Sequence, residues 1–473
     1  MSEVRKIAHN TAWQFGGKII STGLGLIAVA IMTRTLGVEQ FGWYSTAVGF
    51  LQFIGIFTDF GFTVVTSSML SEPAHDKSKL LGNLFTWRMI TALVTQGLIP
   101  LTIFFFPYPA PIKWAVVIMS LSFIGVSLNQ VFIAYYQTKL ALHIQAIGEV
   151  IGRIFLVAGL IFVAIGNYGF LAMTVIITLA SFAYTAYLWL RAEPIHFQID
   201  RDISRSILKK IWPVALAVIF NCFYLQGDRV ILPLFASQAE VGLYGAAYRV
   251  IDIALQISAM IMGMLLPLIT FAWSRGLKED FKKQAQRGFD LMSLFIIPII
   301  AGALALSGPI MRFVAGDDFA ASGAFLRIQI LTMFGILFGT VFGHINLAIG
   351  RQKQALWIYL FDAILAVIAY FIFIPMLGGF GAAWVRVGSE IFAGAGLLIM
   401  AGVFSGFWPR LGAFIKIIFS GVIMGYIVYI IQPMNLLISI LIGIVVYAVL
   451  VLSLRVISKQ TLHEAFPYFQ KLL

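Results

Sequence analysis

The stretch GVEQFGWYSTA (residues 37–47) joins two apolar segments, and a close variant of it, AEVGLYGAA, occupies residues 239–247. In the two copies Gly242 corresponds to Gly42, Tyr244 to Tyr44 and Ala247 to Ala47. A junction that recurs two hundred positions later indicates that the segments flanking it are repeated as well.

The composition shows in what kind of chain this repeat occurs. Of the 473 residues 60% are hydrophobic and 11% are charged, whereas soluble domains are about 45–50% apolar and about 25% charged. A spanning helix needs about 20 apolar residues. The sequence predicts an all-α polytopic membrane protein with about 14 transmembrane helices and no soluble domain. The predicted segments are 11–33, 44–65, 84–106, 114–135, 144–165, 168–190, 211–235, 243–270, 289–306, 324–347, 356–376, 381–401, 412–431 and 436–454.

The charges of the loops predict the topology. Lys and Arg gather in alternate loops, as in the segment 191–210, while the opposite loops hold only Arg34, Lys113 and Arg312. Short cytoplasmic loops collect Lys and Arg, so we expect both termini to be cytoplasmic. The start, MSEVRKIAHN, has no cleavable signal pattern, which favours insertion through an uncleaved first helix. The net charge of +12 is then a topology signal, and nucleic-acid binding is not expected.

Further matches extend the repeat. GNYG (166–169) corresponds to GGFG (378–381), and KLALHI (139–144) to KQALWI (353–358). Six helices bring the chain back to the same side, so the copies are expected to be parallel repeats, a plan that is common among transporters. The predicted parts are a first six-helix bundle, a cytoplasmic linker, a second six-helix bundle, helices 13 and 14, and a cytoplasmic tail, at 1–192, 193–210, 211–403, 404–456 and 457–473.

With these junctions the chain resembles the Wzx-type oligosaccharide flippases of the multidrug/oligosaccharidyl-lipid/polysaccharide (MOP) exporter superfamily. The resemblance covers most of residues 5–455 and is carried by RTLGVEQFGWYSTA (34–47), FTDFGF (57–62), GDRVILPLF (227–235), EVGLYGAAYRV (240–250) and GDDFAAS (316–322). It implies two bundles around a central cavity, alternating access, and an undecaprenyl-pyrophosphate-linked oligosaccharide moved from the inner to the outer leaflet of the cell inner membrane. It also implies that cations in the first bundle and at the start of the second are important, and polysaccharide-assembly proteins are the expected partners.

Ionisable residues at membrane depth are costly and usually face a cavity or a partner. Three predicted helices carry polar stripes at helical spacing, and such stripes are typical of a water-filled cavity; hydrogen bonding between helices is the alternative. The candidate substrate or cavity residues are Lys18, Arg34, Asn221, Arg229, Arg249 and Gln256. The candidates for binding a coupling ion or for holding a cation are Asp59, Asp228 and Asp252.

Two further pairs are expected to be structural. Glu149 and Arg153, and likewise Arg386 and Glu390, are spaced i,i+4, so that each pair can neutralise itself on one helix face. Arg34 lies at a segment end, from which its side chain can extend to the interface.

A cationic cavity has a direct physical reason. A lipid pyrophosphate carries about two negative charges, and moving it unassisted through hydrocarbon would cost tens of kcal/mol. Lys and Arg replace its hydration, and Arg can bind its oxygens bidentately. We expect Lys18 to act when the cavity opens inward and Arg249 when it opens outward. A proton or sodium ion is the expected coupling ion, and the residues do not choose between them.

Enzyme signals are absent from the sequence. The one cysteine, Cys222, excludes a disulfide within the chain, the six histidines show no ligand spacing, and there is no Walker loop, so we expect neither a cofactor nor a metal. Two alternatives stay open: a cation-coupled drug or metabolite antiporter of the same superfamily, and a membrane enzyme such as a polysaccharide polymerase or glycosyltransferase.

Overall fold

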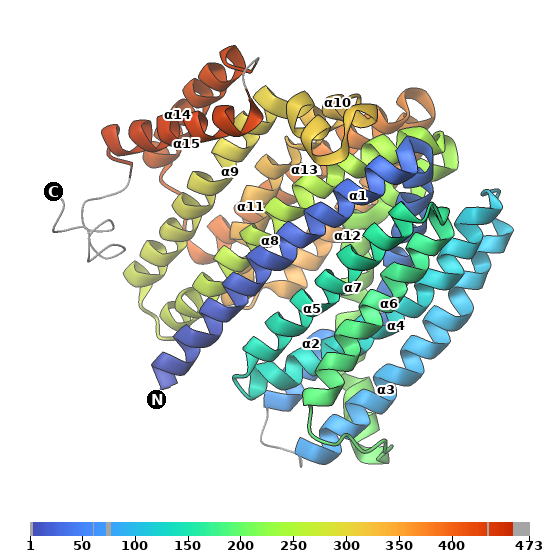
Figure 1. Ribbon diagram of the computed structural model, residues 1–473. Helices are drawn as coiled ribbons and strands as arrows, with labels where there is room; N and C mark the ends of the chain where they lie inside the picture. Colours follow the sequence, from blue (N-terminus) through green and yellow to red (C-terminus); the bar gives the residue numbers. More distant parts are fainter. Residues whose placement is uncertain (1–2, 60, 72–76, 433–434, 457–473) are drawn as a thin grey trace. The chain divides into compact units, whose positions relative to one another are not determined.

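The computed structural model describes residues 3–59, 61–71, 77–432 and 435–456; within these ranges the side chains of 3–12, 15, 56, 64, 67, 68, 71, 77 and 212–225 are outside the described part (Figure 1). The described residues form α-helices and short 3-10 helices and contain no strand. They group into two compact units, Met1–Gly242 and Leu243–Leu473.

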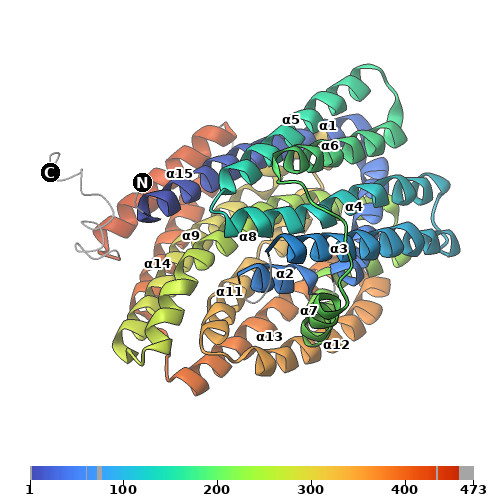
Figure 2. The ribbon, with the colours of Figure 1, turned by 90° about the horizontal axis from the view of Figure 1, so that it is seen from below.

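The first unit contains the helices up to the start of α8. They are α1 (Glu3–Asp59), α2 (Phe62–Ser71), α3 (Lys77–Leu98), the 3-10 helix η1 (Ile99–Phe105), α4 (Ala110–Thr138), α5 (Leu142–Ile165), α6 (Gly169–Arg191) and α7 (Arg201–Phe235). Within this unit α3 lies beside α4, and α5 lies between α1 and α6 (Figures 1 and 2).

The second unit begins inside α8 (Gln238–Ser274). It continues with α9 (Lys278–Ala315), η2 (Asp317–Phe319), α10 (Ser322–Gln329), α11 (Thr332–Ala348), α12 (Gln352–Leu377), α13 (Gly379–Ser405), α14 (Leu411–Ile430) and α15 (Leu436–Ser453). The last two helices pair with each other and pack against α9 (Figure 1), where Tyr447 donates a hydrogen bond to the carbonyl of Leu294 at 3.1 Å.

The helices agree with the predicted number of spans. Twelve helices of the described part are long and apolar enough to cross a membrane, and the first of them, Gly16–Asp59, has 44 residues. At 1.5 Å per residue this helix is about 66 Å long, roughly twice the hydrocarbon thickness of a bilayer, so it contains two spans. With two spans in α1, the described part contains thirteen such spans. The predicted span 211–235 lies in α7, part of whose side chains is outside the described residues. The all-α membrane fold is confirmed.

The chain reverses between the first two spans with a smaller break than the sequence predicts. The predicted segments leave residues 34–43 as a loop, but helix continues on both sides of Gly37, which alone is non-helical (φ 67°, ψ −177°). Glycine adopts such a conformation without the steric clash that a Cβ would cause. One residue therefore makes the break.

Several predicted segments differ from the helices at their boundaries, and two of them bear on the site. The segment 44–65 runs across a second break: α1 ends at Asp59, α2 begins at Phe62, and Gly61 has φ 78°. The segment 211–235 begins too late, because α7 starts at Arg201. The Asp200 carboxylate caps that start by accepting from the backbone N–H groups of Asp202 and Ile203.

Candidate functional site

The two repeated junctions contact each other within the first unit. A Cβ on Gly42 would lie 1.7 Å from the carbonyl oxygen of Gln238, and a Cβ on Gly242 would lie 2.1 Å from the carbonyl oxygen of Val38. Each glycine thus packs on the residue four positions before the other glycine. The contact is reciprocal, and the lack of room for a Cβ on either residue explains why glycine occurs at both places.

Polar contacts continue from this junction along α1 and α7. Thr46 donates to the side chain of Gln238 at 2.8 Å, and Arg229 donates to the side chain of Gln52. The candidate residue Arg229 is therefore bound to α1, and its backbone lies against Gly49 of that helix.

Lys18 lies in an ion pair between α1 and α5. Its Nζ is 3.1 Å from Oε1 of Glu149, and the two side chains are 32% and 22% exposed. Ser21 donates to the same carboxylate oxygen at 2.9 Å. We expected Glu149 and Arg153 to neutralise each other, and this is wrong. Both side chains face α1, and there the carboxylate of Glu149 is paired with Lys18.

Arg153 reaches the same helix interface. Its guanidinium would lie 3.7 Å from a Cβ on Gly25 of α1. The α1–α5 interface consequently holds Lys18 and Arg153 against one carboxylate, so positive charge is in excess there.

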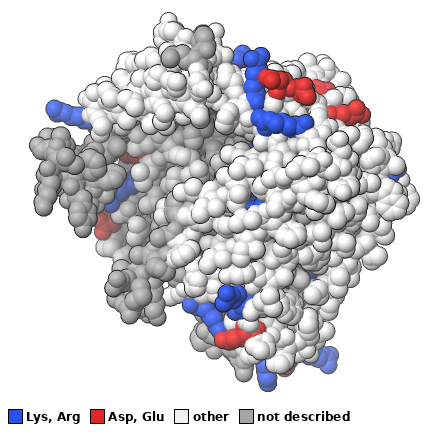
Figure 3. Space-filling model, viewed as in Figure 1, with Lys and Arg blue, Asp and Glu red and all other residues white. Residues whose placement is uncertain are grey.

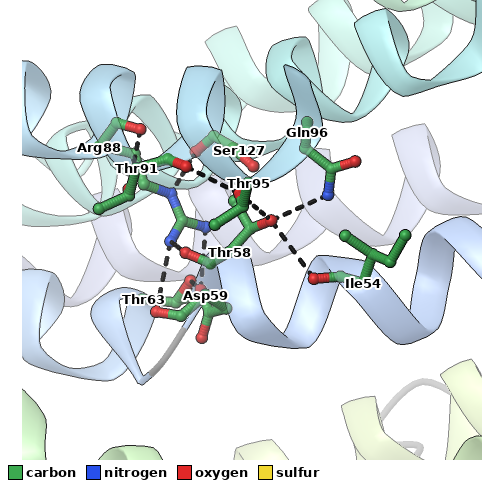
Figure 4. Close-up of polar contacts among 9 residues, drawn as sticks. All are labelled: Ile54, Thr58, Asp59, Thr63, Arg88, Thr91, Thr95, Gln96 and Ser127. Carbon is green, nitrogen blue, oxygen red and sulfur yellow. Dashed lines mark hydrogen bonds and ion pairs between the residues drawn. The ribbon is translucent and has the colours of Figure 1, made fainter. Parts of the chain in front are cut away.

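Asp59 takes part in a network that closes the break between α1 and α2 (Figure 4). Its Oδ1 lies 2.9 Å from Nη2 of Arg88 on α3 and also accepts a hydrogen bond from Thr63 at 2.5 Å. Arg88 is 3% exposed and donates further hydrogen bonds to the carbonyls of Thr58 and Ser127, at 3.2 and 3.0 Å.

This network has a structural explanation. The last carbonyls of a helix have no partner inside the helix, and a cation near that end stabilises them. Arg88 supplies such a cation for the end of α1. Asp59 is thus paired with Arg88 in this structure. The sequence analysis did not name Arg88, although an Arg inside the predicted span 84–106 is a signal that could have found it.

The stripe on α8 belongs to the second unit. Nη1 of Arg249 is 3.7 Å from Oδ2 of Asp252, and both side chains are about a quarter exposed. Gln256, one turn further on, is exposed. The structure brings Arg249 and Asp252 together, with the carboxylate beside the cation.

The remaining candidates have different surroundings. Arg34 is exposed and donates to the carbonyl of Ala30 in its own helix at 3.2 Å. Asp228 is completely buried. The side chain of Asn221 lies outside the described residues, as does that of Cys222.

A buried charged cluster joins α8, α12 and α13 in the second unit. Arg386 lies 3.8 Å from Glu390, as the i,i+4 spacing predicts, and its guanidinium stacks over the ring of Tyr248 at 4.4 Å. Asp362 on α12 is 1% exposed and accepts from the hydroxyl of Ser389 at 2.9 Å. The sequence analysis did not name Asp362, which stands out as a lone carboxylate in the apolar run YLFDAIL.

Among the described residues no group of three or more His, Cys, Asp or Glu side chains could hold a metal ion. Several charges on spanning helices of the described part are paired, and the Lys18–Glu149 and Arg249–Asp252 pairs are partly exposed. Such pairs suit the binding and release of a charged ligand.

Comparison with known proteins decides the family. The family model described as "Polysaccharide biosynthesis protein" matches residues 7–273, more than half of the chain. The chain belongs to this family. A second family model, MatE, matches residues 213–372.

Two relatives of this family member are named as transport proteins. The probable low-salt glycan biosynthesis flippase Agl15 of Haloferax volcanii is 22% identical over 74% of this chain and 72% of the relative. The succinoglycan biosynthesis transport protein ExoT of Rhizobium meliloti is 23% identical over 70% of this chain and 67% of the relative.

Solved structures share the fold. The lipid II flippase MurJ in an inward closed conformation has a TM-score of 0.75 at 17% identity and covers 96% of this chain and 98% of that structure. An inward-facing multidrug resistance MATE family transporter of the MOP superfamily has a TM-score of 0.67 at 14% identity, over 84% of this chain and 98% of the other.

These findings confirm the resemblance to the Wzx-type members of the MOP superfamily. The protein is a multi-pass membrane transporter and not an enzyme, and the same relatives support a location in the inner (plasma) membrane. The alternative of a polymerase or glycosyltransferase is thereby set aside.

Proposed function

We propose that this protein flips a lipid-linked oligosaccharide of the undecaprenyl-pyrophosphate type from the inner to the outer leaflet, for polysaccharide biosynthesis. The route is alternating access through a central cationic cavity. The partly exposed cations of the Lys18–Glu149 and Arg249–Asp252 pairs carry this proposal. The flippase and transport relatives agree with it.

The ion pairs explain how a cation can be kept at membrane depth while no anionic substrate is bound. An unpaired charge at membrane depth is costly, so Glu149 and Asp252 hold Lys18 and Arg249 while no substrate is bound. A pyrophosphate offers more acceptor oxygens and more negative charge than one carboxylate. It displaces the carboxylate from the cation, and the carboxylate reforms the pair when the substrate leaves.

Coupling to a proton or sodium ion completes the proposal. The cluster on α12 and α13 contains two carboxylates, Asp362 and Glu390, beside the single cation of Arg386. One negative charge is thus in excess among buried groups, and uptake of a cation neutralises it. Asp228 and Asp252 are the other carboxylates proposed to bind the ion, and polysaccharide-assembly proteins are proposed as partners.

A cation-coupled drug or metabolite antiporter is the second candidate. The MatE match over residues 213–372 favours it. The two functions require opposite charges in the cavity, because antiported drugs are commonly cationic whereas the lipid pyrophosphate is anionic.

Reconstitution into liposomes separates the two candidates. The purified protein is given a fluorescent undecaprenyl-pyrophosphate oligosaccharide in one experiment and an organic cation under an imposed proton or sodium gradient in another. We expect protein-dependent movement of the lipid-linked sugar and none of the organic cation. Transport of the cation alone would refute the flippase function.

A further inference from the structure

A cationic cavity opens at the start of α9 in the second unit, apart from the charged pairs described above. Its volume is about 480 Å³. Its wall is made by the first turns of α9 and by the loop between α13 and α14. The charged lining residues are Glu279, Lys282, Lys283, Arg287, Asp290 and Arg410.

One side chain fixes the shape of this cavity. Oε1 of Gln286 accepts from the backbone N–H of Arg410 at 2.8 Å, and Nε2 of Gln286 donates to the Arg410 carbonyl at 3.1 Å. Gln286 thus binds both main-chain groups of one loop residue. On the other side Gly406, with φ 68°, ends α13 in a left-handed turn. The loop is therefore held against α9 at Arg410 and begins with a fixed turn at Gly406.

The cavity has an excess of positive charge. Four of its lining residues are Lys or Arg and two are carboxylates. Glu279 pairs with Lys282 at 3.1 Å, where both side chains are exposed, and Asp290 accepts from Gln286 at 2.9 Å. The side chains of Lys283 and Arg410 are exposed. The chemistry favours an anion with several acceptor oxygens, such as a phosphate.

The surroundings of the cavity are apolar. Trp408 is 55% exposed and its ring lies on Gly402, while Leu411 and Ile415 on the first turns of α14 are 50% and 62% exposed. Trp is enriched where a spanning helix meets the membrane interface. On the face of the molecule that Figure 3 shows, Lys, Arg, Asp and Glu are confined to a few places. A ligand that fits both parts is anionic at one end and apolar at the other.

We propose that this cavity binds the phosphate headgroup of an anionic membrane phospholipid, whose acyl chains lie along α14. Basic pockets between spanning helices on the cytoplasmic side bind such headgroups, and the loop charges predict that the start of α9 is cytoplasmic. The lipid is a resident ligand and is not transported. The proposal is independent of the cargo.

The test measures thermal unfolding of the purified protein in a zwitterionic detergent. Phosphatidylglycerol or cardiolipin is titrated in, with phosphatidylcholine and inorganic phosphate in separate arms. We expect saturable stabilisation by the anionic lipids. The double variant Lys283→Gln/Arg410→Gln should weaken apparent lipid binding by on the order of tenfold, while its unfolding temperature without added lipid stays close to that of the wild type. Substitution of Arg410 leaves its backbone contacts with Gln286 in place.

The matched control is Arg275→Gln/Lys278→Gln. It removes the same number of exposed charges just before and at the start of α9 but none from the lining. Equal weakening in both double variants would assign the effect to diffuse surface charge and would overturn the proposal. Stabilisation by inorganic phosphate as strong as that by the lipids, or by phosphatidylcholine as strong as that by phosphatidylglycerol, would overturn it as well.

Discussion

Replacement of Arg88 by Met is expected to destabilise the first unit and to loosen the end of α1. Met fills much of the same volume but leaves Asp59 without its cation and the carbonyls of Thr58 and Ser127 without a donor. Arg88 itself is 3% exposed, so water cannot replace these contacts without entering the helix interface.

The magnitude follows from three considerations. Removal of one partner of a buried ion pair costs about 3–5 kcal/mol in protein interiors. Hydrogen bonds between helices in membranes average only about 0.6 kcal/mol, and Asp59 is 26% exposed, which reduces the loss further. We therefore expect the free energy of unfolding to fall by about 2–3 kcal/mol.

The assay is equilibrium unfolding of the purified protein in mixed micelles of increasing denaturing detergent. Lys79→Met, an exposed change on the same helix, should alter stability by no more than about 0.5 kcal/mol. Asp59→Asn combined with Arg88→Met should cost less than the sum of the two single changes, by about 1 kcal/mol. A wild-type stability for Arg88→Met, or strict additivity in the double variant, would refute the assignment of Arg88 to the helix break.

Three further outcomes are expected. Gly42→Leu should prevent stable folding, because even a Cβ at residue 42 would lie 1.7 Å from a backbone carbonyl oxygen. Gly23→Leu should be tolerated, because a Cβ at residue 23 has no atom within 4 Å. Membrane yield and unfolding temperature are measured for both variants, and equal values would contradict this expectation. Topology reporters at Arg205 and Glu240 should report opposite sides of the membrane, and agreement between them would contradict the alternation of loop charge. Asp362→Asn should abolish the dependence of transport on a proton or sodium gradient while the protein still inserts; unchanged ion dependence would remove this residue from the coupling proposal.

Local sequence patterns were sufficient to predict the spanning helices and some of the contacts described above. Hydropathy predicts the spanning helices because each of them needs about 20 apolar residues to cross the bilayer. The i,i+4 spacing predicts the Arg386–Glu390 contact because both residues share one helix face. The repeated glycines at 42 and 242 signalled a repeated junction, and the structure adds that the two junctions touch.

Contacts between helices could not be predicted from the same patterns. Glu149 had two possible cations, and only the position of α1 beside α5 favours Lys18, which is 131 residues away. The polar residues and the glycine of TDFG (58–61) are compatible with a helix end, but hydropathy alone places 44–65 in one segment. The contacts of Arg88 with Asp59 and with the carbonyl of Ser127 depend on how α3 packs against α1 and α4, which no local pattern shows.

The most direct test of the central claim reverses the two cations assigned to the lipid pyrophosphate. Lys18→Glu and Arg249→Glu are each expressed in cells that lack the native transporter, and exported polysaccharide is measured per amount of protein in the membrane. Arg275→Glu, an exposed reversal outside the charged pairs, is the matched control. The account predicts that export falls by at least tenfold in both variants and stays near the wild-type level in the control. The introduced carboxylate repels the pyrophosphate, and it also repels the carboxylate that was paired with the native cation, Glu149 or Asp252. Wild-type export from both variants would contradict the cationic-cavity mechanism and leave Lys18 and Arg249 as structural partners of their carboxylates.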